Sequence, residues 1–191
     1  MAMRHDTAHL MQVYLVSQMR ASALVARGLG VLGAARGDIE AARIWAKKEG
    51  LETIGHPMAT YVRLLGKPQR RRTHPSSEEY QQEEWAYSLP LWPDLLLTVL
   101  GRADGVTGGL RFAATDDRRS PGQAISVDQL PGWSFLEHEI TQVLPTARVI
   151  ESWYPQSDYE CRLPPQPTAD PIHLAARFDF GLFQDLVPMS G

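Results

Sequence analysis

Three residues could supply ligands to a metal site: Glu52, His56 and Glu139. Glu52 and His56 are four residues apart and share a face if the chain is helical there, and Glu139 falls in another candidate helix. Helical bundles hold di-iron and di-manganese centres with Glu and Glu-x-x-His residues that point inward. The chain contains no Glu-x-x-His, and Gln142 stands three residues after Glu139, where a histidine would be needed. We therefore predict no cofactor, with iron or manganese at these three residues as the alternative.

A basic segment, Lys67 and Arg70–Arg72, could neutralise phosphates. It follows a possible helix-turn-helix over residues 44–66, so a nucleic-acid-binding module using residues 67–72 is a second alternative. Residues 1–72 carry 12 basic and 5 acidic side chains, whereas residues 73–191 carry 7 basic and 17 acidic ones. The acidic remainder disfavours a polyanion partner, and attraction between the two halves or between subunits is the simpler interpretation.

Two further patterns, a glycine motif and a single cysteine, could indicate a nucleotide site or a nucleophile, but the sequence around each disfavours that role. Residues 28–33 match G-x-G-x-x-G, yet a helical pattern rather than a strand precedes them, so we interpret them as a glycine-rich helix end. Cys161, the only cysteine, lies in a proline-rich segment with no histidine near it in sequence. The sequence therefore predicts neither a dinucleotide site nor a nucleophilic triad.

The elements that would position these residues are predicted to be helices. Apolar residues recur every three or four positions over residues 7–34, and similar patterns cover 39–50, 58–66, 92–113 and 133–144. Ser76 or Ser77 could cap one more helix, with Glu78 and Glu79 in its first turn. The predicted fold class is mainly α, a four-helix bundle over residues 1–145.

Residues 146–191 differ in character. They contain prolines at positions 155, 164, 165, 167 and 171, and Leu174, Ala176, Phe178 and Phe180 alternate as in a strand. We predict a proline-rich, partly extended C-terminal arm that packs on the helical body or on a partner subunit.

Two stretches resemble the ferritin-like subunits of the phenylacetyl-coenzyme A oxygenase type. Residues 49–66, with Glu49, Glu52, His56, Tyr61 and Leu65-Gly66, are similar to that family's second helix. Leu91-Trp92-Pro93-Asp94 and the later Asp104-Gly105 are similar to its third helix. The resemblance covers roughly residues 8–145 and implies a ferritin-like bundle. Because the family's Glu and Glu-x-x-His iron ligands are missing, it implies a degenerate, non-catalytic member that pairs with another subunit.

Together these observations predict a non-catalytic accessory or structural subunit in a multi-subunit complex, with a protein partner or a second copy of itself. A metal-dependent oxygenase of ferritin-like fold is the enzymatic alternative. No run of about 18 uncharged apolar residues occurs, and residues 1–12 do not have the order of a signal peptide. We therefore expect a cytoplasmic protein with no membrane association.

Overall fold

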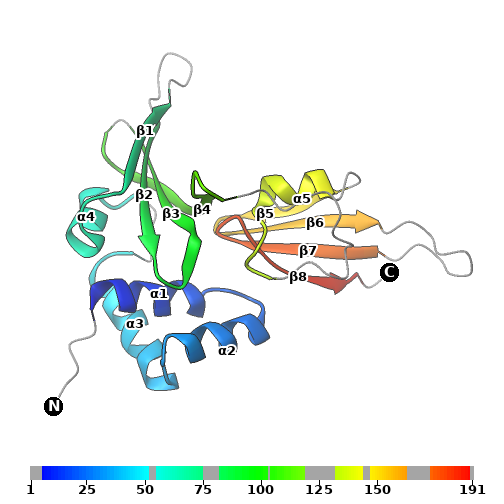
Figure 1. The fold of residues 1–191 in the computed structure, drawn as a ribbon, viewed down its shortest axis with the longest axis horizontal. Helices are drawn as coiled ribbons and strands as arrows, with labels where there is room; N and C mark the ends of the chain where they lie inside the picture. Colours follow the sequence, from blue (N-terminus) through cyan, green and yellow to red (C-terminus); the bar gives the residue numbers. More distant parts are fainter. Residues whose placement is uncertain are drawn as a thin grey trace, which may run out of the picture. The chain divides into compact units, whose positions relative to one another are not determined.

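The computed structural model describes residues 6–51, 55–74, 82–102, 104–118, 132–143, 147–162 and 173–189. The chain divides into two compact units, Met1–Thr115 and Asp116–Gly191, called here the first and the second unit. In each unit helical structure comes first along the chain and a four-stranded antiparallel sheet follows (Figure 1).

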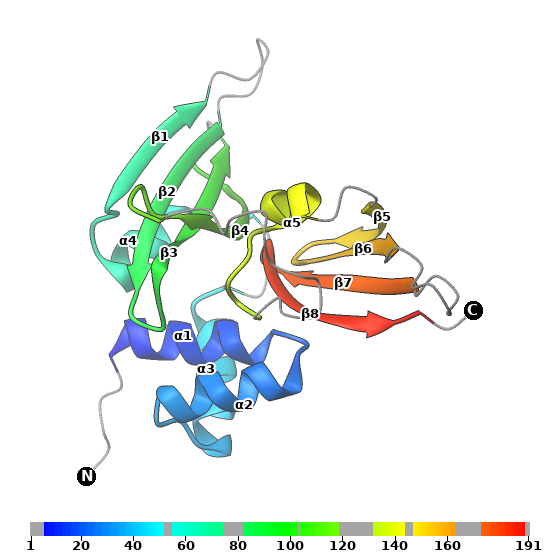
Figure 2. The ribbon, with the colours of Figure 1, turned by 45° about the vertical axis from the view of Figure 1, so that its right-hand side comes forward.

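The first unit opens with four helices: α1 (Thr7–Ser17), α2 (Ser22–Val31), α3 (Arg36–Lys48) and α4 (Ala59–Leu65). The Asp6 carboxylate caps α1 by accepting from the Ala8 amide, and Asp38 in α3 accepts from the Ala35 amide at 2.7 Å. The middle of α1 is buried nearly all round, which fits its central place among the helices in Figure 2.

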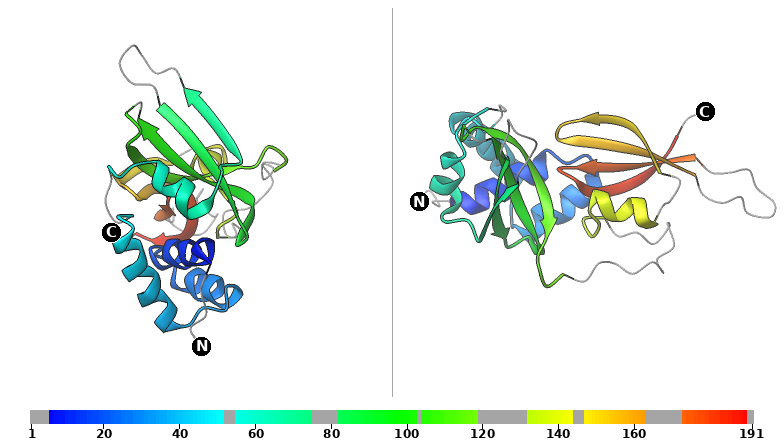
Figure 3. Two further views of the ribbon diagram at one scale, coloured as in Figure 1. Left: turned by 90° about the vertical axis from the view of Figure 1, so that its left-hand side faces the viewer. Right: turned by 90° about the horizontal axis from the view of Figure 1, so that it is seen from above.

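The first sheet is formed by β1 (Arg70–His74), β2 (Gln82–Leu89), β3 (Trp92–Arg102) and β4 (Thr107–Ala114), in that order. Tyr87, Leu97 and Phe112 are register partners on neighbouring strands, and all three are buried. A side chain at Gly101 would overlap the Met58 side chain, which is buried just before α4. The missing Cβ therefore lets α4 approach the sheet closely (Figure 3).

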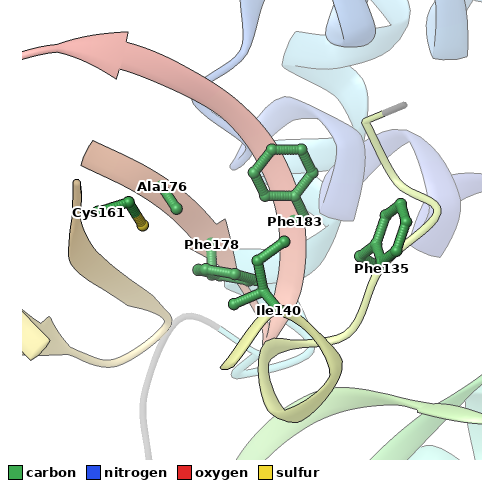
Figure 4. Close-up of a cluster of buried hydrophobic side chains, with 6 residues drawn as sticks. All are labelled: Phe135, Ile140, Cys161, Ala176, Phe178 and Phe183. Carbon is green, nitrogen blue, oxygen red and sulfur yellow. The ribbon is translucent and has the colours of Figure 1, made fainter. Parts of the chain in front are cut away.

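The second unit consists of α5 (Glu137–Val143), β5 (Arg148–Trp153), β6 (Gln156–Arg162), β7 (His173–Asp179) and β8 (Leu182–Pro188). Its sheet order is β5-β6-β7-β8. Figure 4 shows the core between α5, the loop before it and the sheet, and its members are Phe135, Ile140, Cys161, Ala176, Phe178 and Phe183.

The predicted fold class was wrong: the chain is not a mainly α, four-helix ferritin-like bundle, and two antiparallel sheets dominate it. Residues 92–113, predicted as a helix, form β3, a turn and β4. Leu95, Leu96 and Leu97 are all buried, because both faces of β3 are covered, and such a strand has no alternating pattern. The ferritin-like resemblance is overturned with the bundle, since the Leu91–Asp94 and Asp104-Gly105 motifs belong to strand ends and a hairpin turn.

Several local predictions were closer to the structure. The pattern over 7–34 is two helices separated at Gln18–Ala21, while α3 and α4 lie where helices were expected. The helical periods predict that Trp45 and Leu64 are buried. Leu64 is buried, whereas Trp45 is only half-buried. Leu174, Ala176 and Phe178 lie at alternating positions of β7 as predicted, whereas Phe180 lies in the turn after the strand. The strand belongs to a sheet with its own core. In the described ranges, no helix has the length and apolar character needed to cross a bilayer.

Candidate interaction surface

The three residues predicted to hold a metal come from different parts of the chain. Glu52 lies outside the described residues. His56 lies before α4 in the first unit, with its ring centroid 5.2 Å from that of Tyr61, and Glu139 lies in α5 of the second unit. No group of three His, Cys, Asp or Glu residues suited to a metal occurs in the described part of the chain. Iron or manganese at these positions stays a prediction.

Glu139 has a structural role in the second unit. Its two carboxylate oxygens each accept a hydrogen bond from the Arg118 guanidinium at 2.9 Å, and one also accepts from the Leu136 amide at 2.8 Å. The side chains of Arg118 and Glu139 are 8% and 6% exposed. The Glu139 carboxylate thus accepts from a backbone amide just before α5 and neutralises the buried Arg118 cation.

The predicted polyanion-binding segment lies at the edge of the first sheet. Arg70, Arg71 and Arg72 begin β1, and Lys67 precedes it. The Arg71 guanidinium lies 4.4 Å from the centroid of the Trp85 ring, a cation–π contact within the sheet. Arg72 is the register partner of Glu84 on β2, so acidic residues adjoin the basic strand and lower its positive potential. Nucleic-acid binding stays a prediction.

Glu84 is the centre of a small ionic cluster that sequence reasoning missed. The carboxylate is buried and contacts Arg111 at 2.7 Å and His74 at 2.8 Å. Burial raises the pKa of the Glu84 carboxyl, but the hydrogen bonds and positive charges of Arg111 and His74 outweigh burial, and the pKa is lowered from its ordinary value of 4.5. Glu84 and its two partners come from three different strands, so sequence spacing gives no sign of the cluster.

Acidification should therefore weaken the first unit through Glu84. A carboxyl whose pKa is lower in the folded than in the unfolded chain stabilises the fold above the unfolded-state pKa, and this stability is lost as the pH falls through the folded-state value. The free energy of unfolding, measured by urea denaturation from neutral pH down through the acid range, should fall less steeply below about pH 4.5 in Glu84→Gln than in the wild type. Equal slopes would contradict this assignment.

A second buried carboxylate has the same kind of partners. Glu160 on β6 contacts Arg148 of β5 at 2.7 Å and His173 of β7 at 3.3 Å. Each sheet thus contains one glutamate that joins three strands through an arginine and a histidine. These contacts stabilise the strand pairing in each sheet.

The main exposed apolar feature lies on β5 and the turn after it. Val149, Ile150, Trp153 and Tyr154, called here the β5 strip, are 52%, 48%, 75% and 48% exposed. They are four of the six exposed large hydrophobic residues in the described part of the chain, and the other two, Val31 and Ile44, belong to different helices. The concentration of four within six residues makes this edge the candidate contact surface.

The strip is held on a well-defined hairpin. Among the strands that the structure describes, β5 lies at the sheet edge and pairs only with β6, and Trp153 is the register partner of Gln156 across the hairpin end. The Phe180 amide donates to the Pro155 carbonyl at 2.7 Å, and the Phe180 ring meets Tyr154 edge to face with centroids 6.3 Å apart. These contacts tie the turn to the β7–β8 turn, so the strip sits on a supported scaffold.

The aromatic residues of the C-terminal segment 146–191 differ in burial. Phe178, Phe180 and Phe183 are buried, whereas Trp153 and Tyr154 are exposed. The sequence R-V-I-E-S-W over 148–153 contains a signal for exposed apolar side chains on β5. Val149 and Ile150 are neighbours, and neighbouring residues of a strand cannot both face one core.

No protein-family model matches the chain, and no curated protein matches it in sequence. Among solved structures, a crystal structure of a candidate β-lactamase inhibitor protein from Streptococcus mutans aligns with 78% of this chain and 94% of its own. The two are 9% identical, with a TM-score of 0.30, which is too low to show a common fold.

Proposed function

We propose that this chain is a non-catalytic accessory protein that binds another polypeptide through the β5 strip. The observation that supports the proposal most directly is the exposure of Trp153 and its three apolar neighbours on one edge strand and the turn after it. Tryptophan and tyrosine dominate the energetics of protein interfaces, and clustered exposed apolar side chains are uncommon on monomers.

The non-catalytic part of the proposal is supported by the states of the candidate reactive groups. Glu84, Glu139 and Glu160 are each engaged in an ion pair. Burial raises the pKa of the Cys161 thiol, which disfavours the nucleophilic thiolate. We also place the protein in the cytoplasm, supported by this single, buried, free cysteine.

Photo-crosslinking at the strip tests the proposal. A photoreactive phenylalanine analogue is introduced at Trp153 of the full chain in the source cells, and a matched variant carries it at Ile44, which is 62% exposed on α3. We expect a discrete adduct of higher mass from position 153 and much less from position 44, because only the strip is a docking surface. Mass spectrometry then identifies the captured polypeptide.

Equal adduct yields at positions 153 and 44 would contradict the proposal. A second variant with the analogue at Tyr154, 48% exposed beside Trp153, guards against an unfavourable geometry at one position. Absence of an adduct from both strip positions rejects the strip as a docking surface.

A further inference from the structure

The order of residues on β5 is complementary to itself. Arg148, Val149, Ile150 and Glu151 run basic, apolar, apolar, acidic. When two copies of this segment are set antiparallel about a two-fold axis between Val149 and Ile150, each Arg148 is opposite a Glu151 and each Val149 opposite an Ile150. Opposite charges and apolar pairs at directly opposed positions both stabilise a sheet.

A regular strand would not allow this pairing. Antiparallel partners must lie on the same face, and neighbouring residues alternate, so residues 148 and 151 would normally lie on opposite faces. The β5–β6 register contains a bulge, with Val149 opposite Tyr159 and Glu151 opposite Asp158, which leaves Ile150 as an extra residue. The extra residue brings positions 148 and 151 onto the same face of the sheet, opposite Glu160 and Asp158.

We propose that two copies of this chain associate through their β5 edges, antiparallel and symmetric about that axis. This inference rests on the proposed function, because it names the polypeptide that occupies the β5 strip. The two four-stranded sheets join into one of eight strands, and the backbone groups of β5 that face away from β6 gain partners.

The exposed residues fit this occupant. Bulges and charged residues commonly protect edge strands from pairing with another chain. The extra residue of this bulge is instead an isoleucine, 48% exposed, which leaves an apolar side chain available for pairing. Trp153 becomes a diagonal neighbour of Arg148 from the second copy, a separation that aromatic and long side chains can span. A guanidinium beside an indole is favourable. The whole chain has a net charge of −3, so the overall repulsion between two copies is small.

Sedimentation velocity of the purified full chain over a hundredfold range of concentration tests the proposal. We expect a species of twice the 21.3 kDa chain mass that dissociates on dilution. Ile150→Lys should weaken the self-association roughly tenfold or more, because it buries a charge at the centre of the interface. Ile44→Lys, at the exposed α3 position, should leave it unchanged.

A charge-exchange experiment fixes the register. Arg148→Glu alone and Glu151→Arg alone each place like charges opposite one another, and each should weaken self-association roughly tenfold. Mixing the two variants should restore a heterodimer of near wild-type affinity, because each pair then joins opposite charges. The mixture also controls for the lost Arg148–Glu160 contact, since that loss remains in the heterodimer.

Three results would overturn the proposal: a wild-type chain that stays monomeric at all concentrations, a dimer whose affinity is unchanged by Ile150→Lys, or a mixture of the two charge variants that forms no heterodimer. If the chain is monomeric and position 153 still crosslinks to a different polypeptide, the second copy is the wrong occupant and the strip remains a docking surface. If neither association nor an adduct is found, the proposed function fails as well.

Discussion

Replacing Phe178 with alanine is expected to lower the free energy of unfolding of the second unit by about 3–5 kcal/mol. Phe178 is fully buried on β7, with its ring centroid 5.7 Å from that of Phe183 and 5.6 Å from that of Tyr159. Truncation removes the ring from the middle of a small core, and the surrounding strands are held in register on both sides of β7, so they cannot close the cavity.

Urea denaturation of the full chain measures this effect. The loss should appear in the transition of the second unit, which can be followed separately because two compact units need not unfold together. Ile44→Ala, at a position 62% exposed on α3, is the matched control and should change stability by less than about 0.5 kcal/mol. A Phe178→Ala transition coincident with the wild type would mean that the second unit has a different core.

The helices were easier to predict than the sheets, for a physical reason. α3 has exposed and buried faces, with Ala42 and Ala46 buried, so its period is visible in the sequence. β3 is covered on both faces and reads as an apolar run, which periodicity cannot separate from a buried helix. The Asp104-Gly105 turn and the Gly108-Gly109 pair were the local signals for a hairpin. The length of the apolar segment over residues 92–113 favoured a helix instead.

β2 shows how a charged segment misleads. Glu83 and Glu84 continue the acidic run after Glu78 and Glu79 and are typical of a solvated helix face, yet Trp85, Tyr87 and Leu89 follow at every second position, the period of a strand. Burial of Glu84 depends on Arg111 and His74 from two other strands. Long-range partners of this kind cannot be read from one sequence, so the ionic clusters are seen only in the folded chain.

The buried ion pair between Arg118 and Glu139 should be the most sensitive polar contact of the second unit. Arg118 donates to both oxygens of Glu139 and, through Nη2, to the Ser134 carbonyl at 2.5 Å. It therefore joins the segment before α5 to the helix itself. Removing the cation leaves a carboxylate that is 6% exposed and has lost its compensating charge.

Arg118→Met is accordingly expected to lower the free energy of unfolding by about 3–5 kcal/mol, as is typical when one partner of a buried pair is removed. Adding Glu139→Leu to that variant should recover much of the loss, because the uncompensated charge disappears, although the cap on the Leu136 amide is lost with it. The double-mutant cycle, measured by urea denaturation, isolates the coupling between the two side chains. Additive losses in the double variant would show that each side chain acts alone, and that Arg118 does not hold α5 through Glu139.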